Sequence, residues 1–374
     1  MKIALYDLYV YLIFFSLFKA YFIPNAVRQA IKIVTLVLVF AFLIQRLKKR
    51  EVYNRSLLFS GVIIISGFYN YILGNYTVKA LMDSFLYAFT FYDLYSFFLY
   101  SNTHNFIGRM SKNLYRANLI YCILTVISVL VVGVENNSNN AAYMFGNKFT
   151  SSYLFISLIA LYGLAHNMNL KRNRRIICAL IAFGCFFTIY VGCATATVAL
   201  IVAVILFVIG KKLHVNSIQG SVVAVSALIG TAIVPFVINA VLKINIVKYI
   251  IFDVFQRSIT VYGRFEIYNN YLESLLKDHF WLGYGYSNGV MMNITGVFGN
   301  VQNGLLEQMM NFGFIGVMAI LFTVFYALKK KKELSYMVIL LYAMIVAAIF
   351  EVTINWFFWI SIFSIQWLEK QEEI

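Results

Sequence analysis

Charged residues are scarce in this sequence: they make up 12% of its 374 positions, whereas about 25% is usual in soluble domains. Only two prolines occur, so long helices are rarely interrupted. The four cysteines form neither a CxxC pair nor a zinc-type spacing, which argues against a redox motif or a cysteine-based metal site. Such a composition excludes an ordinary soluble globular protein.

Apolar runs of about 20 residues, the length that spans a bilayer, fill most of the chain instead. The net charge of +15 does not point to nucleic acid, because the cations sit in short clusters between apolar runs. We therefore predict an all-α polytopic membrane protein of about twelve transmembrane helices. Their expected ranges are 3–23, 29–45, 57–73, 80–100, 119–134, 151–165, 176–191, 195–209, 220–242, 304–328, 334–350 and 353–368, the last two being compatible with one helix bent at 351–355.

Three units follow from these ranges: an N-terminal bundle of about nine helices over 1–242, a long polar segment over 243–303, and C-terminal helices over 304–374. Basic clusters occupy alternate connections, and such clusters face the cytoplasm. They lie at 46–55, 109–116, 171–175, 211–212 and 329–332. We therefore expect cytoplasmic termini and an outward-facing segment 243–303, which we call the outer segment.

The outer segment contains its own amphipathic helix. Glu273 and Lys277 form an i,i+4 pair on its polar face, and Gly283 ends the helical pattern. The apolar residues at helical spacing are Phe265, Tyr268, Tyr271, Leu272, Leu275 and Leu276. A helix of this kind is suited to lie over the outer surface of the bundle or in the headgroup zone.

A candidate anion site lies where the outer segment meets the helix at 304–328. Asn303 is a plausible N-cap, and the positive end of the helix dipole points toward the outer segment. Arg257 and Arg264 lie in that segment, and an arginine fork suits a phosphate or diphosphate. These features favour an anionic lipid headgroup. The alternative is that the arginines pair with Asp253, with Glu266 or with bulk lipid phosphate.

Several spacings resemble a known family. Gly263-Arg264-x-x-x-Tyr268 is followed by the amphipathic helix and by Leu-Gly-Tyr-Gly at 282–285. Next come Gln302-Asn303, nine residues, Gly313, two residues and Gly316. This order resembles the signature loop of bacterial O-antigen polymerases and ligases. The resemblance is specific over 253–316 and architectural elsewhere.

The resemblance implies a metal-independent glycosyltransferase with a fold similar to the C-type membrane glycosyltransferases, acting at the outer leaflet of the bacterial cytoplasmic membrane. Its substrates would be an undecaprenyl-diphosphate-linked oligosaccharide and a growing polysaccharide, with a chain-length regulator, a flippase and membrane lipid as partners. No cofactor and no nucleic acid are expected. Arg264 would hold the diphosphate, Arg257 is a second hypothetical contact, and Tyr268 belongs to the same motif. Gly313 and Gly316 would let their helix pack closely on a neighbour.

The general base is less clear from the sequence, because the ligase branch has histidine where this chain has Gln302. Glutamine can orient a hydroxyl group but cannot deprotonate it. Glu307, one turn beyond Asn303, is our first choice for the base. The alternatives are Glu266, Glu273 and Asp253, and less favourably His279.

Asp83 is a further substrate-binding candidate, since ionisable groups within spans are often functional. The alternative is that it only neutralises Lys79, one turn away.

These observations favour a Wzy-type repeat-unit polymerase, as used in O-antigen, capsule or exopolysaccharide biosynthesis. A ligase that transfers a finished glycan to a lipid or protein acceptor is disfavoured by Gln302. A flippase for the same lipid-linked sugar would be expected to show inverted repeats or helices broken at the midplane, and neither is evident in the sequence. A non-enzymatic scaffold would leave the spaced arginine, Gln-Asn and glycine residues unexplained.

Overall fold

The computed structural model describes residues 2–18, 20, 22–134, 143–166, 170–212, 220–241, 244–249, 253, 267–268, 272–329, 331 and 334–368. Over these residues the chain is helical, and its only extended pairing is an isolated bridge between Ala20 and Phe145. The all-α prediction is therefore confirmed for the described part of the chain.

The first ten helices are α1 (Lys2–Leu17), α2 (Asn25–Arg46), α3 (Lys49–Val52), α4 (Ser56–Ile72), α5 (Val78–Thr103), α6 (Ile107–Val132), α7 (Lys148–Ala165), α8 (Leu170–Tyr190), α9 (Ala194–Lys212) and α10 (Ser221–Val241). Those that follow are α11 (Asn245–Tyr249), α13 (Leu272–Asp278), α14 (Val290–Thr295), α15 (Gly304–Leu328), α16 (Tyr336–Ala347), α17 (Trp356–Phe363) and a π-helical turn, η3 (Ser364–Leu368).

A helix lies over each predicted range. By length and composition, four of the described helices could cross a membrane, namely α2, α6, α7 and α15, and shorter apolar helices accompany them. This supports a membrane protein, whereas the number of spans stays a prediction. The last two ranges are separate helices, because α16 ends at Ala347 and Asn355 caps α17 through the N–H of Phe357 at 3.0 Å.

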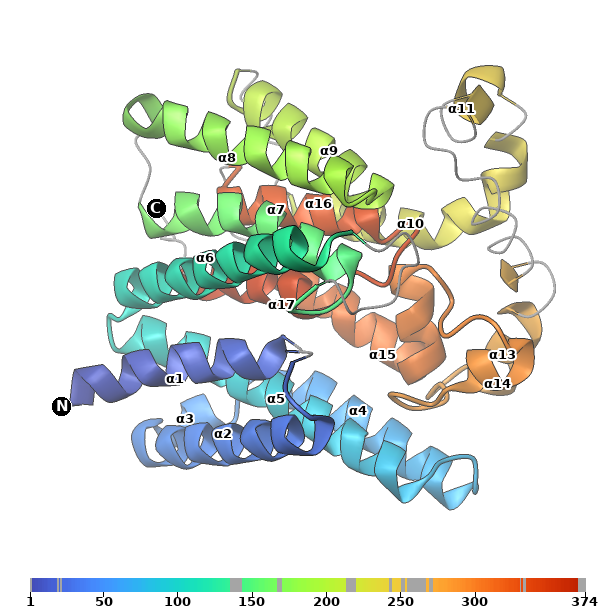
Figure 1. Ribbon diagram of the computed structural model, residues 1–374. Helices are drawn as coiled ribbons and strands as arrows, with labels where there is room; N and C mark the ends of the chain where they lie inside the picture. Colours follow the sequence, from blue (N-terminus) through green and yellow to red (C-terminus); the bar gives the residue numbers. More distant parts are fainter. Residues whose placement is uncertain are drawn as a thin grey trace.

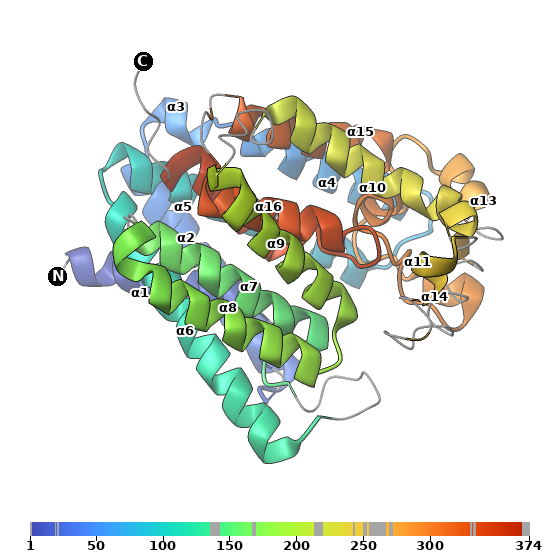
Figure 2. The same cartoon turned by 90° about the horizontal axis from the view of Figure 1, so that it is seen from above.

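The helices run alongside one another as a bundle, with α13 and α14 at one end and the start of α1 at the opposite end (Figure 1; Figure 2). Helix α15 packs against α10 and α4, and α5 packs against α2 and α4. Aromatic rings fill the centre: Phe59 of α4 lies 4.9 Å from Phe91 of α5 and 5.3 Å from Trp359 of α17, between ring centroids. The Phe59–Phe91 pair is face-to-edge, and aromatic contacts of this kind stabilise a core beyond the area that they bury.

The outer segment is packed onto the bundle through a small apolar core of its own. Its members are Ile267, Tyr268, Leu272, Leu275, Met291, Val301, Leu306 and Met310, the last two from α15. Helix α13 turns Leu272 and Leu275 inward, while Glu273 and Lys277 form an exposed ion pair at 2.6 Å. The predicted amphipathic character is confirmed for this stretch, and residues 254–266 and 269–271 lie outside the described residues.

Candidate functional site

The start of α15 is fixed by Asn303, whose side chain is fully buried. Its Oδ1 accepts the Leu306 N–H at 3.0 Å, as predicted for an N-cap. Its Nδ2 donates to the carbonyls of Thr231 at 2.8 Å and Ile349 at 3.1 Å, which ties α15 to α10 and to the segment after α16. The Gly304 N–H donates to the Ala348 carbonyl at 2.7 Å. The N–H groups of Gly304 and Leu306 are therefore used within the chain and do not hold an anion in this arrangement.

Glu307 lies one turn further along α15, beneath the end of the outer segment. Its Oε2 accepts the Val301 N–H at 2.9 Å, and its Oε1 accepts the Asn311 amide at the longer distance of 3.4 Å. Asn311 in turn accepts the Asn288 amide at 3.0 Å. Glu307 is thus oriented from both the helix and the outer segment. Because the hydrogen bond at Oε1 is the longer and weaker of the two, Oε1 is the better acceptor for a further hydrogen bond.

Helix α15 is broken at Gly313, whose φ of 64° and ψ of −168° are non-helical. The outer segment supplies the missing backbone partners at this break. Tyr284 N–H donates to the Met310 carbonyl at 2.7 Å, and Gly285 N–H to the Asn311 carbonyl at 2.9 Å. In the other direction, the N–H groups of Phe314 and Ile315 donate to the carbonyls at 280 and 281, at 2.7 and 3.2 Å. The run 280–285 is therefore part of the α15 hydrogen-bond ladder.

Helix α4 holds the other edge of this run. Ser66 donates to the Leu282 carbonyl at 2.5 Å, and the Asn70 amide donates to the Gly283 carbonyl at 2.8 Å. Both polar side chains are completely buried in an otherwise apolar helix. Because an unpaired buried carbonyl is costly, these two residues make it possible for a non-helical stretch of backbone to lie inside the bundle.

A second group of polar residues connects this region to α5. Tyr76 contacts Ser84 at 2.7 Å between their hydroxyl oxygens, and its hydroxyl also donates to the Tyr286 carbonyl. The Tyr286 ring stacks on Tyr87 with 4.3 Å between centroids. Burial, together with the negative charges of Asp83 and Glu307, raises the pKa of Tyr286 to about 12. The two predicted acidic residues Asp83 and Glu307 thus both lie within electrostatic range of one phenol.

The remaining predicted site residues are distributed as follows. Gln302 is half-buried with a φ of 58°, a left-handed conformation that is uncommon outside glycine, and its N–H donates to Asn300 at 2.9 Å. Tyr268 is buried and donates to the Gln302 carbonyl at 3.2 Å, so it supports the backbone beside Glu307. Arg257, Arg264 and Glu266 lie outside the described residues.

The described contacts of the alternative bases differ. Asp253 is exposed in a part of the outer segment where only that residue is described. Glu273 is paired with Lys277 on the exposed face of α13, which argues against it as the base. The His279 ring stacks on Tyr284 with 4.0 Å between centroids, and its buried Nδ1 has no hydrogen-bond partner among the described residues. The choice of Glu307 as the base therefore stays a prediction.

The two glycines of the resemblance have different neighbours. Gly316 lies where α15 packs on α4, and a Cβ added there would come within 3.7 Å of Val62 of α4, as the expectation of close helix packing requires. Gly313 instead faces the backbone of the outer segment at Trp281 and Leu282, not a neighbouring helix. The reason is that the positive φ of Gly313 ends regular α-helix there and admits the run 280–285.

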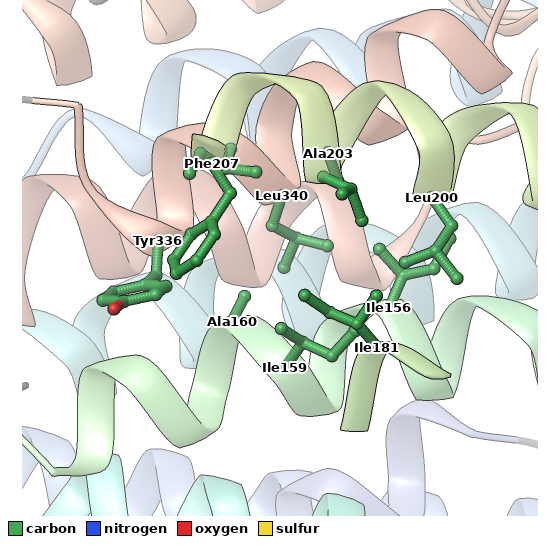
Figure 3. A pocket seen from close by; sticks show the side chains of 11 residues that line it. Ile156, Ile159, Ala160, Ile181, Leu200, Ala203, Phe207, Tyr336 and Leu340 are labelled. Carbon is green, nitrogen blue, oxygen red and sulfur yellow. The ribbon is translucent and has the colours of Figure 1, made fainter. Parts of the chain in front are cut away.

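A cavity elsewhere in the bundle has no polar chemistry to offer. It is lined by α7, α8, α9 and α16, and its walls are aliphatic apart from the rings of Phe207 and Tyr336 (Figure 3). The Tyr336 ring lies directly over Gly163, where any Cβ would approach it within 2.4 Å. We interpret this cavity as a packing gap between helices.

Asn311, Asn288, Ser66, Asn70, Tyr76 and Tyr286 were not predicted. Asn311 follows Glu307 by four residues, and Ser66 and Asn70 show the same spacing in an apolar helix, so an i,i+4 polar pair was the available signal. Nothing local in the sequence indicates that the residues near 285 pair with Tyr76 or with the break in α15.

Comparison with known families places this region in context. The family model described as O-antigen ligase matches residues 176–321, from α8 to the middle of α15. The match covers the outer segment, Gln302-Asn303, Glu307 and both glycines of α15. It confirms the resemblance to the O-antigen polymerase and ligase superfamily and points to glycan processing in a membrane. No curated protein and no solved structure matches the chain.

Proposed function

We propose that this member of the O-antigen polymerase and ligase superfamily is a repeat-unit polymerase that extends a lipid-linked glycan at the outer leaflet of the bacterial cytoplasmic membrane. The observation that carries the proposal is the position of Glu307. Its carboxylate lies at the start of α15, is oriented by Val301 and Asn311, and adjoins the outer segment that bears the arginine motif. A carboxylate positioned by defined donors is the kind of group that acts as a general base.

In the proposed reaction, Glu307 Oε1 accepts the proton of an acceptor sugar hydroxyl. The hydroxyl oxygen forms a bond to the anomeric carbon of the donor glycan, while the bond from that carbon to the diphosphate oxygen breaks. The diphosphate leaves on its undecaprenyl carrier, and its growing charge is neutralised by Arg264, with Arg257 as a second contact. No metal or cofactor enters this scheme.

The neighbouring residues have supporting roles in this scheme. Asn311 and Asn288 hold the Glu307 carboxylate through consecutive hydrogen bonds. Asn303 positions the helix start and not the substrate, since its amide is buried and engaged at both ends. Gln302 is half-buried beside this site and is proposed to orient the acceptor hydroxyl.

A ligase is the second candidate function, because the description of the matched family is O-antigen ligase. In that case Glu307 would activate a hydroxyl of a lipid or protein acceptor. Gln302 distinguishes this chain from the histidine of the ligase pattern, which favours the polymerase. In either case we expect cytoplasmic termini, with a flippase that supplies the substrate and a regulator that sets chain length.

The test is a gel assay of membranes that contain the protein, incubated with undecaprenyl-diphosphate-linked repeat units. A ladder of lengthening products that is lost in Arg264→Ala would support the polymerase. A single mobility shift onto a different acceptor would favour the ligase. Relocation of intact repeat units across the bilayer, with no new glycosidic bond, would exclude both enzymes and favour a flippase.

A further inference from the structure

A groove of about 680 Å³ opens between the first turns of α2 and α5, and the function proposed above does not use it. Helix α5 follows the α4–α5 turn, which points toward the end of the bundle where α13 and α14 lie (Figure 1). A volume of this order is typical of small-molecule sites. The groove is therefore large enough for a headgroup and the first units of a lipid tail.

The groove combines cations with an apolar wall. Arg28 and Lys79 line it from opposite helices, together with Asp83. Lys32, one turn beyond Arg28, lies within electrostatic range of both Asp83 and Arg28. The wall is formed by Ile33, Met82, Phe85, Leu86 and Phe89.

The expectation that Asp83 merely neutralises Lys79 is not met. In the part of the chain that the structure describes, these two side chains form no ion pair within 4.0 Å. Arg28 and Lys79 line the groove together with the Asp83 carboxylate, and Lys32 lies within electrostatic range of that carboxylate. The cationic side of the groove is therefore left to attract an anion, and arginine with lysine at the edge of an apolar wall suits a phosphate on a lipid. Ile33, Met82 and Phe85 are exposed, so the apolar wall opens to the outside of the bundle, where we expect the lipid chains of the membrane.

The groove is connected to the site at α15. Ser84, next to Asp83, contacts the Tyr76 hydroxyl, which donates to the Tyr286 carbonyl. Tyr286 lies within electrostatic range of both Asp83 and Glu307. A lipid headgroup in the groove would therefore lie next to the hydrogen-bonded chain Ser84–Tyr76–Tyr286, which reaches the outer segment.

We propose that the α2–α5 groove binds the diphosphate headgroup of the second lipid-linked glycan, the one that supplies the acceptor hydroxyl. The inference rests on the polymerase proposal, since a polymerase handles two lipid-linked chains at once. Arg28 and Lys79 contact the diphosphate, Lys32 adds positive charge nearby, and the first isoprene units lie along Ile33, Met82 and Phe85. Asp83 accepts a hydrogen bond from a hydroxyl of the first sugar. The arginines of the outer segment serve the donor chain.

The test measures binding of undecaprenyl diphosphate to the full-length protein in phosphatidylcholine nanodiscs, beside the gel assay. In the binding measurement every protein also carries Arg257→Gln/Arg264→Gln, the one without groove substitutions serving as the wild type, so that the arginines assigned to the donor chain do not contribute to the signal. The variants are Arg28→Gln/Lys79→Gln, the charge-preserving Arg28→Lys/Lys79→Arg, and a control, Lys49→Gln/Arg50→Gln, on the exposed helix α3. We expect the neutral double variant to bind about tenfold more weakly or worse, since it loses charge-assisted hydrogen bonds, while the other two stay near wild type. Unchanged thermal unfolding of the neutral variant verifies that it is folded.

Equal binding in the neutral variant and the wild type overturns the groove proposal, and so does displacement of the diphosphate by an equal amount of phosphatidylglycerol, which would indicate a general anionic-lipid contact. The two proposals fail separately. If the wild type forms a ladder and the neutral variant binds and polymerises normally, the polymerase proposal holds and the groove proposal fails. If binding depends on the groove but the wild type forms no ladder, the groove is a lipid-diphosphate site in a protein that is not a polymerase.

Discussion

Gly283 faces the backbone of Gly313, and Gly313 faces the backbone of Trp281 and Leu282, with no room for a side chain at either glycine. A Cβ on Gly283 would come within 2.6 Å of the Gly313 nitrogen, and a Cβ on Gly313 within 2.3 Å of the Trp281 carbonyl oxygen. Both residues also have positive φ angles of 64°. The break in α15 and the docking of the outer segment therefore depend on one pair of glycines, which lies two turns beyond the Glu307 carboxylate.

Gly313→Ala is expected to destabilise the protein by about 2 kcal/mol or more, because it adds a backbone clash to an unfavourable left-handed conformation. The measurement is unfolding in detergent, by heat or by added denaturing detergent. Gly61→Ala is the matched control, since Gly61 lies within α4 with nothing within 4 Å of an added Cβ. That substitution should be neutral or stabilise slightly. Equal effects of the two substitutions on unfolding would contradict the close backbone packing at Gly283 and Gly313.

Asn303→Ala should cost more than the loss of a simple helix cap. It removes the acceptor for Leu306 and leaves the carbonyls of Thr231 and Ile349 without their donor. Ser335→Ala is the control, because the Ser335 hydroxyl caps α16 by accepting the Val338 N–H at 3.2 Å. We expect Asn303→Ala to lower the free energy of unfolding by about 1–3 kcal/mol beyond the control, owing to the buried unpaired carbonyls. Indistinguishable unfolding curves would show that these two carbonyls find other partners.

The raised pKa of Tyr76 leads us to expect that the stability of the protein depends on pH. Burial and the charge of Asp83 raise the pKa of Tyr76 from 10.0 to about 12. The stabilisation by its protonated phenol is therefore complete below pH 10 and is lost as the pH rises toward 12. Tyr76→Phe loses the hydrogen bonds to Ser84 and to the Tyr286 carbonyl, so it should be less stable at pH 9. The difference in the free energy of unfolding between Tyr76→Phe and the wild type should become smaller by ~1 kcal/mol near pH 11.5, after allowance for partial solvation. A constant difference between the two proteins across this range would contradict the assignment.

The fold was predictable where a local property determines it. Apolar run length and basic clusters predicted the helix ranges, and the position of Asn303 predicted its role as the N-cap of α15. The break at Gly313 was not predictable, because its hydrogen-bond partners at 280–285 lie about thirty residues away and periodicity reports only on neighbours along the helix.

The candidate site divides in the same way. Glu307 was found because it follows Asn303 by one turn at the entrance of an apolar helix. Asn311 and Asn288 were missed because their importance comes from hydrogen bonds that exist only after the outer segment has docked. Asp83 was singled out as an ionisable group in a membrane-spanning range, and its role stays a prediction. Its neighbours Arg28 and Lys32 come from α2, and that proximity is a property of the tertiary structure.

The central claim is that Glu307 removes the proton from the acceptor hydroxyl. The most direct test compares the polymerisation rates of Glu307→Gln and Glu273→Gln with that of the wild type in the gel assay. Glutamine at 307 can still accept the Val301 N–H, so this variant should fold, and its rate should fall at least ~100-fold with the loss of a general base. Glu273, exposed and paired with Lys277 on α13, should tolerate the same change. A ladder of wild-type rate and length from Glu307→Gln would contradict the account.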